Sequence, residues 1–112
     1  MRFLSVGLLF ILSSYLFGQS GTLKGRVAEK INNEPIPFAN IFIPELSVGV
    51  SSDFEGNYSI ENIKPGIYNI NFSFIGFETY TAFEIIVNSN KPTIINAKLT
   101  ESSTSLEEVE IK

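Results

Sequence analysis

The stretch from Asp53 to Phe77 constrains the fold most strongly, because its apolar residues recur at every second position. Four apolar side chains alternate there with asparagine and serine, namely Tyr68, Ile70, Phe72 and Phe74. A period of two places alternate residues on opposite faces of an extended strand. These four side chains are therefore expected to line a core while the polar ones face water. Tyr58 and Ile60 alternate with polar residues in the same way, which predicts a preceding strand.

A tight turn is predicted between these two strands, at Lys64-Pro65-Gly66. Proline fixes its own φ and glycine tolerates a positive φ, so Pro65 followed by Gly66 suits a type II turn. The whole stretch is thus predicted to be a strand–turn–strand unit.

Five further segments have the length and alternation of short strands: Thr22–Ala28, Ala39–Ile43, Val48–Ser51, Thr79–Val87 and Thr93–Leu99. Their expected inward residues include Leu23, Gly25 and Val27, then Phe83, Ile85 and Val87, then Ile95, Ala97 and Leu99. Turn-forming residues separate the segments, and no helical period follows the N-terminal region. Seven short, evenly spaced strands predict an all-β sandwich.

Residues 1–18 are predicted to be a secretory signal peptide rather than part of this domain. Arg2 supplies the positive charge, Phe3 to Leu12 is apolar, and small residues follow. The apolar run is too short for a transmembrane helix, which needs about 20 residues. Cleavage is expected after Gly18, with Ser20 as the alternative site.

The charge balance argues against nucleic acid or an anionic membrane surface as a partner. Loss of Arg2 leaves seven basic against twelve acidic residues, and no basic cluster is present. Cysteine is absent, so an exported domain of this size must depend on its apolar core.

The residue types offer little for catalysis. The chain has neither histidine nor cysteine, which removes the usual nucleophile–base pairs, zinc sites and redox motifs. Asp53 and Glu55 lack the further ligands of a calcium loop and are interpreted as a solvated turn. No catalytic, cofactor or metal residue is therefore predicted. Phe38, Phe42 and Phe54 lie off the inward alternation or in turns, so they either form an exposed aromatic contact patch or cover the ends of the sandwich.

An ordered series of short motifs resembles the carboxypeptidase-regulatory-like domain. The series comprises Gly25-Arg26-Val27, Pro35 to Ile41, Asp53 to Ile60, Pro65 to Tyr68 and Ile75-Gly76-Phe77. The resemblance covers Gly21 to about Leu99 and implies a seven-stranded Greek-key β-sandwich of the transthyretin type, with domain bounds of 21–100. In Bacteroidetes, such domains commonly lie between a signal peptide and the plug of a SusC-type TonB-dependent outer-membrane receptor.

Residues 101–112 are interpreted as a linker followed by a segment similar to a TonB box. Glu101 to Ser105 is small and polar, and the segment itself consists of Leu106, Glu107, Glu108, Val109, Glu110 and Ile111. A β-prone segment of this kind can add as a strand to a sheet edge of a TonB-type energising protein. The resemblance then implies a non-catalytic accessory domain at the periplasmic side of the outer membrane, involved in nutrient import. Its plug and barrel, absent from this chain, would provide the membrane association.

Two other classes of function stay open. One is a free-standing exported module that binds carbohydrate or protein through an aromatic patch. The other is the accessory domain of an exported peptidase.

Overall fold

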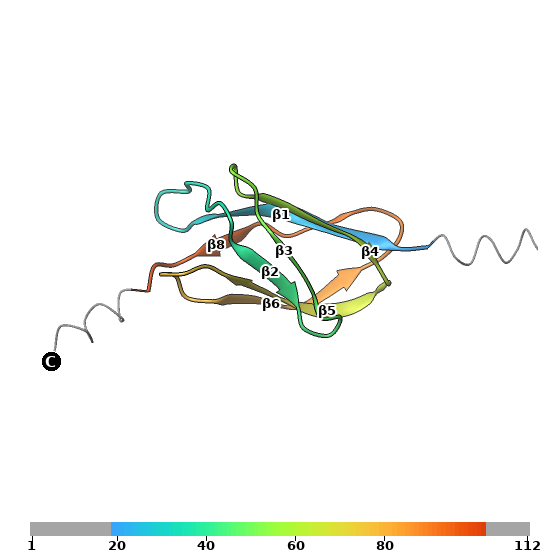
Figure 1. Cartoon of the computed structure of the whole chain (residues 1–112). Helices are drawn as coiled ribbons and strands as arrows, with labels where there is room; N and C mark the ends of the chain where they lie inside the picture. The colour runs from blue at the N-terminus through green and yellow to red at the C-terminus, as the bar shows by residue number, and fades with distance from the viewer. Residues whose placement is uncertain (1–18, 103–112) are drawn as a thin grey trace, which may run out of the picture.

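Residues 19–102, the part of the chain that the computed structural model describes, form strands stacked as two sheets (Figure 1). The strands are β1 (Gly21–Glu29), β2 (Asn40–Ile43), β3 (Val48–Ser51), β4 (Asn57–Ile63), β5 (Gly66–Ser73), β6 (Tyr80–Val87), β7 (Thr93–Ile94) and β8 (Ala97–Leu99). Across this range no helix has the length and hydropathy needed to cross a membrane.

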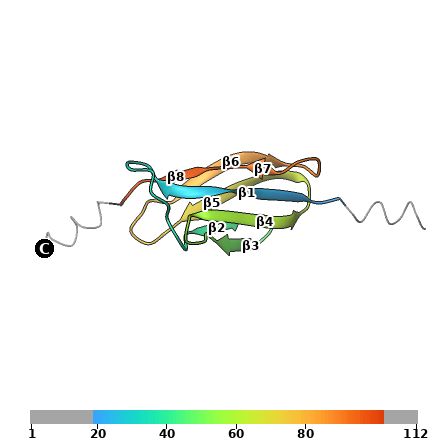
Figure 2. The same cartoon turned by 90° about the horizontal axis from the view of Figure 1, so that it is seen from above.

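In the first sheet, β1 pairs antiparallel with β4 and parallel with both β7 and β8. The second sheet is antiparallel throughout, in the order β3-β2-β5-β6. Figure 2 shows the two layers from above, with β6 running along the same side of the sandwich as β7 and β8. The chain enters β1 at one end of the sandwich and leaves beyond β8 at the other (Figure 1).

The core lies between the sheets and consists of the side chains that the alternation places inward. Ile70 and Phe72 of β5 are fully buried, and Tyr58 of β4 covers Phe72 with an edge-on contact at 5.6 Å between ring centroids. Such aromatic pairs contribute about 0.5–1.5 kcal/mol beyond the burial of their area. The prediction of an all-β sandwich is confirmed, as are the inward positions of Tyr58, Ile60, Tyr68, Ile70 and Phe72.

The predicted strand from Thr93 to Leu99 is divided into β7 and β8 at Ile95–Asn96. At the break, the Asn96 side-chain oxygen accepts a hydrogen bond from the backbone N–H of Arg26 at 3.0 Å. The carbonyl of Ile95 accepts one from the Tyr58 hydroxyl at 2.7 Å. Side chains thus provide the hydrogen bonds that a continuous ladder would have formed. The alternation of apolar and polar residues gives no indication that side chains replace backbone partners at this point.

Strand β6 contains a bulge, and because of it the predicted inward direction of Phe83 is wrong. Phe83 was expected inward but is 69% exposed, and Ala82 is the buried residue in its place. The register of β5 and β6 shifts between Tyr68 and Ile70, and Glu84 has a φ of 52°. The Glu84 N–H donates to the Asn69 side-chain oxygen at 3.0 Å. One extra residue in a strand moves the side chains before it to the opposite face of the sheet. Phe83 therefore points outward.

The turn at Lys64-Pro65-Gly66 is present, but the predicted type II geometry is wrong. A type II turn requires a positive φ at Gly66, whereas Gly66 already belongs to β5 and the positive φ lies at Asn62, at 61°. The Tyr68 hydroxyl donates to the Lys64 carbonyl and closes the connection. A side chain within the following strand therefore replaces the backbone hydrogen bond of a standard turn.

Candidate functional site

Two of the three predicted contact aromatics, Phe38 and Phe54, form an exposed pair. Their ring centroids lie 5.2 Å apart with an angle of 77° between the ring planes. Phe38 is 58% exposed and Phe54 is 78% exposed. An edge-on pair of this geometry is favourable, yet both rings leave much of their apolar surface in water. The pair is a candidate contact surface on the residues that the sequence singled out.

The backbone holds Phe38 in an unusual conformation. Its φ is 61°, in the left-handed region that a bulky side chain rarely adopts. Buried Ser52 fixes the surrounding backbone: its hydroxyl accepts from the Ala39 N–H at 2.8 Å and donates to the Ile36 carbonyl at 2.7 Å. The Phe38 N–H donates to the Ser52 carbonyl at 3.0 Å. Strain of this kind persists only where neighbouring contacts determine it, so the direction of the Phe38 ring is set by the fold.

The loop of Phe54 is closed by Asp53. One carboxylate oxygen of Asp53 accepts hydrogen bonds from the N–H groups of Glu55 and Asn57, both at 2.9 Å. Gly56 follows with a φ of 81°. The Asp53 carboxylate therefore closes a turn, in agreement with its interpretation from sequence. Among residues 19–102, no three His, Cys, Asp or Glu side chains are grouped as a metal ion would require.

Phe42 lies apart from this pair. It is half-buried on β2, opposite Gly49 of β3, and a Cβ added to Gly49 would come within 3.2 Å of the Phe42 ring. The missing side chain of Gly49 makes room for the ring on the outer face of the second sheet. The three aromatics thus form one exposed pair and one separate, half-buried ring.

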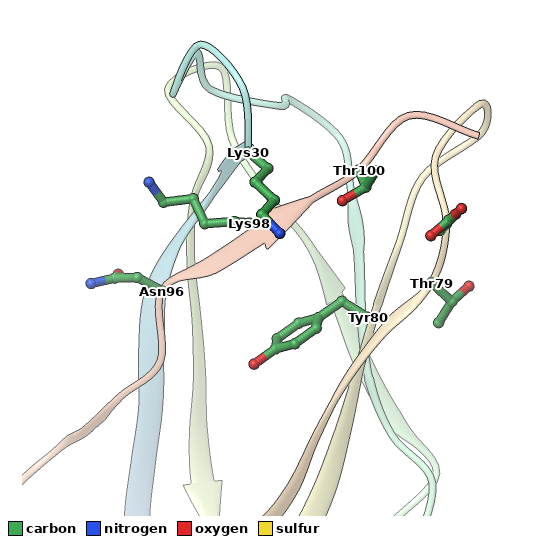
Figure 3. Close-up of a pocket in the computed structure, with 7 residues that line it drawn as sticks. Lys30, Thr79, Tyr80, Asn96, Lys98 and Thr100 are labelled. Atoms are coloured by element: carbon green, nitrogen blue, oxygen red, sulfur yellow. The ribbon is translucent and has the colours of Figure 1, made fainter. Parts of the chain in front are cut away.

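A pocket of about 330 Å³ lies between the side of β8 and the start of β6 (Figure 3). Its lining residues are Lys30, Glu78, Thr79, Tyr80, Asn96, Lys98 and Thr100. In Figure 3, Lys30 extends into the pocket region from the end of β1, and the ring of Tyr80 reaches across from β6. Lys98 extends the other way, and its ammonium donates to the Asn33 side-chain oxygen at 2.7 Å.

Sequence reasoning missed this pocket because its residues come from distant segments. Lys30 belongs to a polar loop, Tyr80 begins a strand, and Lys98 is one of several outward-facing polar residues. No spacing relates them. The parallel pairing of β1 with β8, and the position of β6 beside β8, bring them together.

The segment similar to a TonB box, Leu106 to Ile111, lies outside the described residues. The chain leading to it is fixed to the sandwich as far as Ser102. The Glu78 N–H donates to the Thr100 carbonyl at 2.8 Å, and the Ser102 N–H donates to the Gly76 carbonyl at 2.9 Å. The described part of the chain therefore ends close to the pocket, since Thr100 and Glu78 also line it.

These features describe a small β-sandwich module with an exposed aromatic pair and a pocket lined by polar and charged residues. Residues 23–111 match the model of the CarboxypepD_reg-like domain family. The chain belongs to this family, as its motif series indicated.

A receptor and two solved structures are among the proteins similar to this chain. TonB-dependent receptor P3 of Formosa agariphila is 30% identical over 101 residues, which cover 90% of this chain and 10% of the receptor. The chain thus spans about a tenth of the length of this relative. The Bacillus anthracis TIE protein matches 74% of this chain and 17% of its own, with a TM-score of 0.59 and 15% identity. A Bacteroides uniformis protein provisionally described as carbohydrate binding matches 73% of this chain and 42% of its own, with a TM-score of 0.58 and 12% identity. These two structures share the sandwich fold with this chain.

Proposed function

We propose that this chain is the N-terminal accessory domain of a TonB-dependent outer-membrane receptor that imports nutrients. The observation that supports this most directly is its relationship to a TonB-dependent receptor along 90% of its own length. In this proposal residues 1–18 are a signal peptide that directs export, and the sandwich lies on the periplasmic side of the outer membrane. The domain itself performs no catalysis.

Residues 106–111 are the segment that engages the TonB-type energising protein in this proposal. The family match extends to residue 111, so this segment belongs to the same matched unit as the sandwich. Its apolar residues Leu106, Val109 and Ile111 suit strand addition to a sheet edge, where main-chain hydrogen bonds provide the affinity. Ser102 is bonded to the sandwich, which leaves a linker of three residues before the segment.

Binding to the periplasmic domain of TonB from the source organism tests this role. The mature chain and its Val109→Pro variant are compared by calorimetry, with Thr104→Pro in the linker as the matched control. Proline removes a backbone donor and prevents strand pairing at its position. We expect Val109→Pro to weaken binding at least tenfold and Thr104→Pro to leave it within twofold. Equal affinities for all three proteins would refute the assignment of this segment.

The genomic reading frame beyond the codon for Lys112 tests the covalent part of the proposal. A frame that continues into a plug and a strand-rich barrel supports the receptor. A stop codon at this position refutes the covalent model.

The exposed Phe38–Phe54 pair favours a second candidate, a module that binds carbohydrate or protein. Two apolar rings held in fixed positions by Ser52 and Asp53 form a preorganised contact surface. Titration with neutral and uronic-acid hexasaccharides, followed by the ring resonances of both phenylalanines, tests it. Saturable shifts that are lost in Phe54→Ala and kept in Phe83→Ala, an exposed aromatic on β6, support this function. Unchanged ring resonances at millimolar sugar count against it.

A further inference from the structure

The pocket between β6 and β8 presents a cation with no counter-ion in the described part of the chain. Lys30 donates through its backbone N–H to Leu99, but its ammonium has neither an ion pair nor a hydrogen bond within residues 19–102. The ammonium of Lys98 is bonded only to the neutral amide oxygen of Asn33. Glu78 is the one carboxylate in the lining. The lining residues therefore carry two ammonium groups against one carboxylate, and the ammonium of Lys30 is the one that extends into the pocket.

The polar groups around Lys30 include hydroxyls that can donate hydrogen bonds. Tyr80 makes a ring contact with Phe72 at 5.8 Å between centroids, and its hydroxyl has no hydrogen-bond partner within residues 19–102. Asn96 lies at the rim: its side chain extends away from Lys30 and Tyr80 in Figure 3, and its oxygen accepts from the Arg26 N–H. The hydroxyl of Thr100 completes this set. An ammonium beside several neutral donors matches a carboxylate, because charge-assisted hydrogen bonds to an anion are the strong ones.

The nearest source of carboxylates along the chain is its own C-terminal segment. Glu107, Glu108 and Glu110 lie between the apolar residues Leu106, Val109 and Ile111. Ser102 is fixed two residues beyond Thr100, which itself lines the pocket. The five residues from Ser102 to Glu107 reach at most about 17 Å when extended. A pocket of this charge therefore lies within reach of an acidic segment at high effective concentration.

We propose that the pocket lined by Lys30, Tyr80 and Thr100 binds a glutamate carboxylate of the chain's own segment 106–111. Docking of this kind holds the segment against the sandwich and competes with its pairing to any other protein. If the segment has the TonB role proposed above, the pocket regulates access to it. The docking itself does not rest on that role.

Cleavage by a glutamate-specific protease tests the docking in the mature chain, in the absence of TonB. Lys30→Gln removes the unpaired cation, and Lys91→Gln is the control with the same charge change in the turn before β7. We expect cleavage after Glu107 and Glu108 to be at least fivefold faster in Lys30→Gln than in the unmodified chain, and unchanged in Lys91→Gln. Equal rates in both variants would overturn the proposal.

Amide resonances of the pocket provide a second measurement that does not depend on protease access. The mature chain is compared with a Glu107→Gln/Glu108→Gln/Glu110→Gln variant, in which the sandwich sequence is intact. We expect shifts at Lys30, Tyr80 and Thr100, and none at Lys64 at the far end of the sandwich. Identical spectra at the pocket would contradict docking even where the cleavage rates differ.

Added ligands then distinguish the chain's own segment from an outside carboxylate. The triple variant is titrated with a blocked Leu-Glu-Glu-Val-Glu-Ile hexapeptide and, separately, with glucuronate. Saturable shifts with the peptide and none with glucuronate support the proposal. Shifts with glucuronate alone would assign the pocket to an acidic sugar and overturn the proposed occupant. Because TonB is absent from these assays, a negative result would refute the docking without affecting the proposed TonB binding. Likewise, a failure of TonB binding would leave the docking result unchanged.

Discussion

The ring of Phe38 meets the ring of Phe54 edge-on at 5.2 Å between centroids, although the φ of Phe38 is 61°. A bulky residue in the left-handed region costs about 1–2 kcal/mol, and the edge-on contact returns about 0.5–1.5 kcal/mol. The two ranges overlap, so the contact and the strain are of similar size. The hydrogen bonds that Ser52 makes with the same backbone also hold this conformation.

Replacement of Phe38 by glycine or alanine separates the strain from the contact. Both variants lose the ring, but only alanine retains the penalty of a positive φ. We expect Phe38→Gly to be more stable than Phe38→Ala by about 1 kcal/mol, measured as the free energy of unfolding in urea. In a segment without strain the order reverses, because glycine loses more conformational freedom on folding. An Ala variant at least as stable as the Gly variant would therefore contradict the strained conformation.

Ser52→Ala tests the hydrogen bonds that fix this backbone. The change leaves the Ala39 N–H and the Ile36 carbonyl without their side-chain partner in a site that is 2% exposed. A buried unsatisfied polar group costs about 1–3 kcal/mol, so we expect a loss of about 3 kcal/mol in the free energy of unfolding. Ser59→Ala, on the exposed face of β4, serves as the control and should stay within about 0.5 kcal/mol. Similar losses in both would show that Ser52 has no special role.

Tyr58 is expected to make stability fall at high pH. Burial raises the pKa of its hydroxyl above the ordinary value, because the charged phenolate is poorly solvated there. The unfolded chain loses this proton near pH 10 while the folded chain keeps it, so the folded state binds more protons and the slope of stability with pH is negative. The contribution of Tyr58 is complete below about pH 9 and is lost as the pH rises further.

Urea unfolding of Tyr58→Phe between pH 7 and pH 11 measures this contribution. At pH 7 the variant should lose about 1–2 kcal/mol, since the Ile95 carbonyl no longer accepts a hydrogen bond. Its ring contact with Phe72 is retained. The difference between the two proteins should shrink above pH 10. A constant difference across the range would mean that Tyr58 ionises equally in both states.

Gly25 is required by the close approach of the chain at the break between β7 and β8. A Cβ at this position would collide with the Ile95 carbonyl oxygen, which is backbone and cannot rotate away. We expect Gly25→Ala to cost about 3 kcal/mol in the free energy of unfolding, at the upper end for overpacking. Gly76→Ala is the comparison: its Cβ meets nothing within 4 Å but its φ is 86°, so a loss of about 1 kcal/mol is expected. Equal losses would remove the steric explanation.

Much of the fold follows from local pattern alone. Alternation in β4 and β5 identified the inward faces, because burial of one face of a strand requires an apolar residue at every second position. The same rule failed at Phe83, where one extra residue reverses the facing of the strand before it. It also failed to divide β7 from β8, where the side chains of Asn96 and Tyr58 replace ladder hydrogen bonds.

Of the two candidate sites, the sequence indicated the aromatic pair but not the pocket. Sequence reasoning selected Phe38 and Phe54 because they lie outside the inward alternation, but it could not separate them from Phe42. The pocket around Lys30 had no sequence signal, since its residues come from segments that meet only through strand pairing.

The sequence by itself determined the β-sandwich class, the inward faces of most strands and the family of this chain. These depend on residue type at fixed local spacing. Tertiary structure alone decided which aromatic rings meet, where the ladder is broken and which polar side chains gather in the pocket beside Lys30. Those outcomes depend on the pairing of strands far apart in the chain, where side chains satisfy backbone groups and charges that local pattern does not connect.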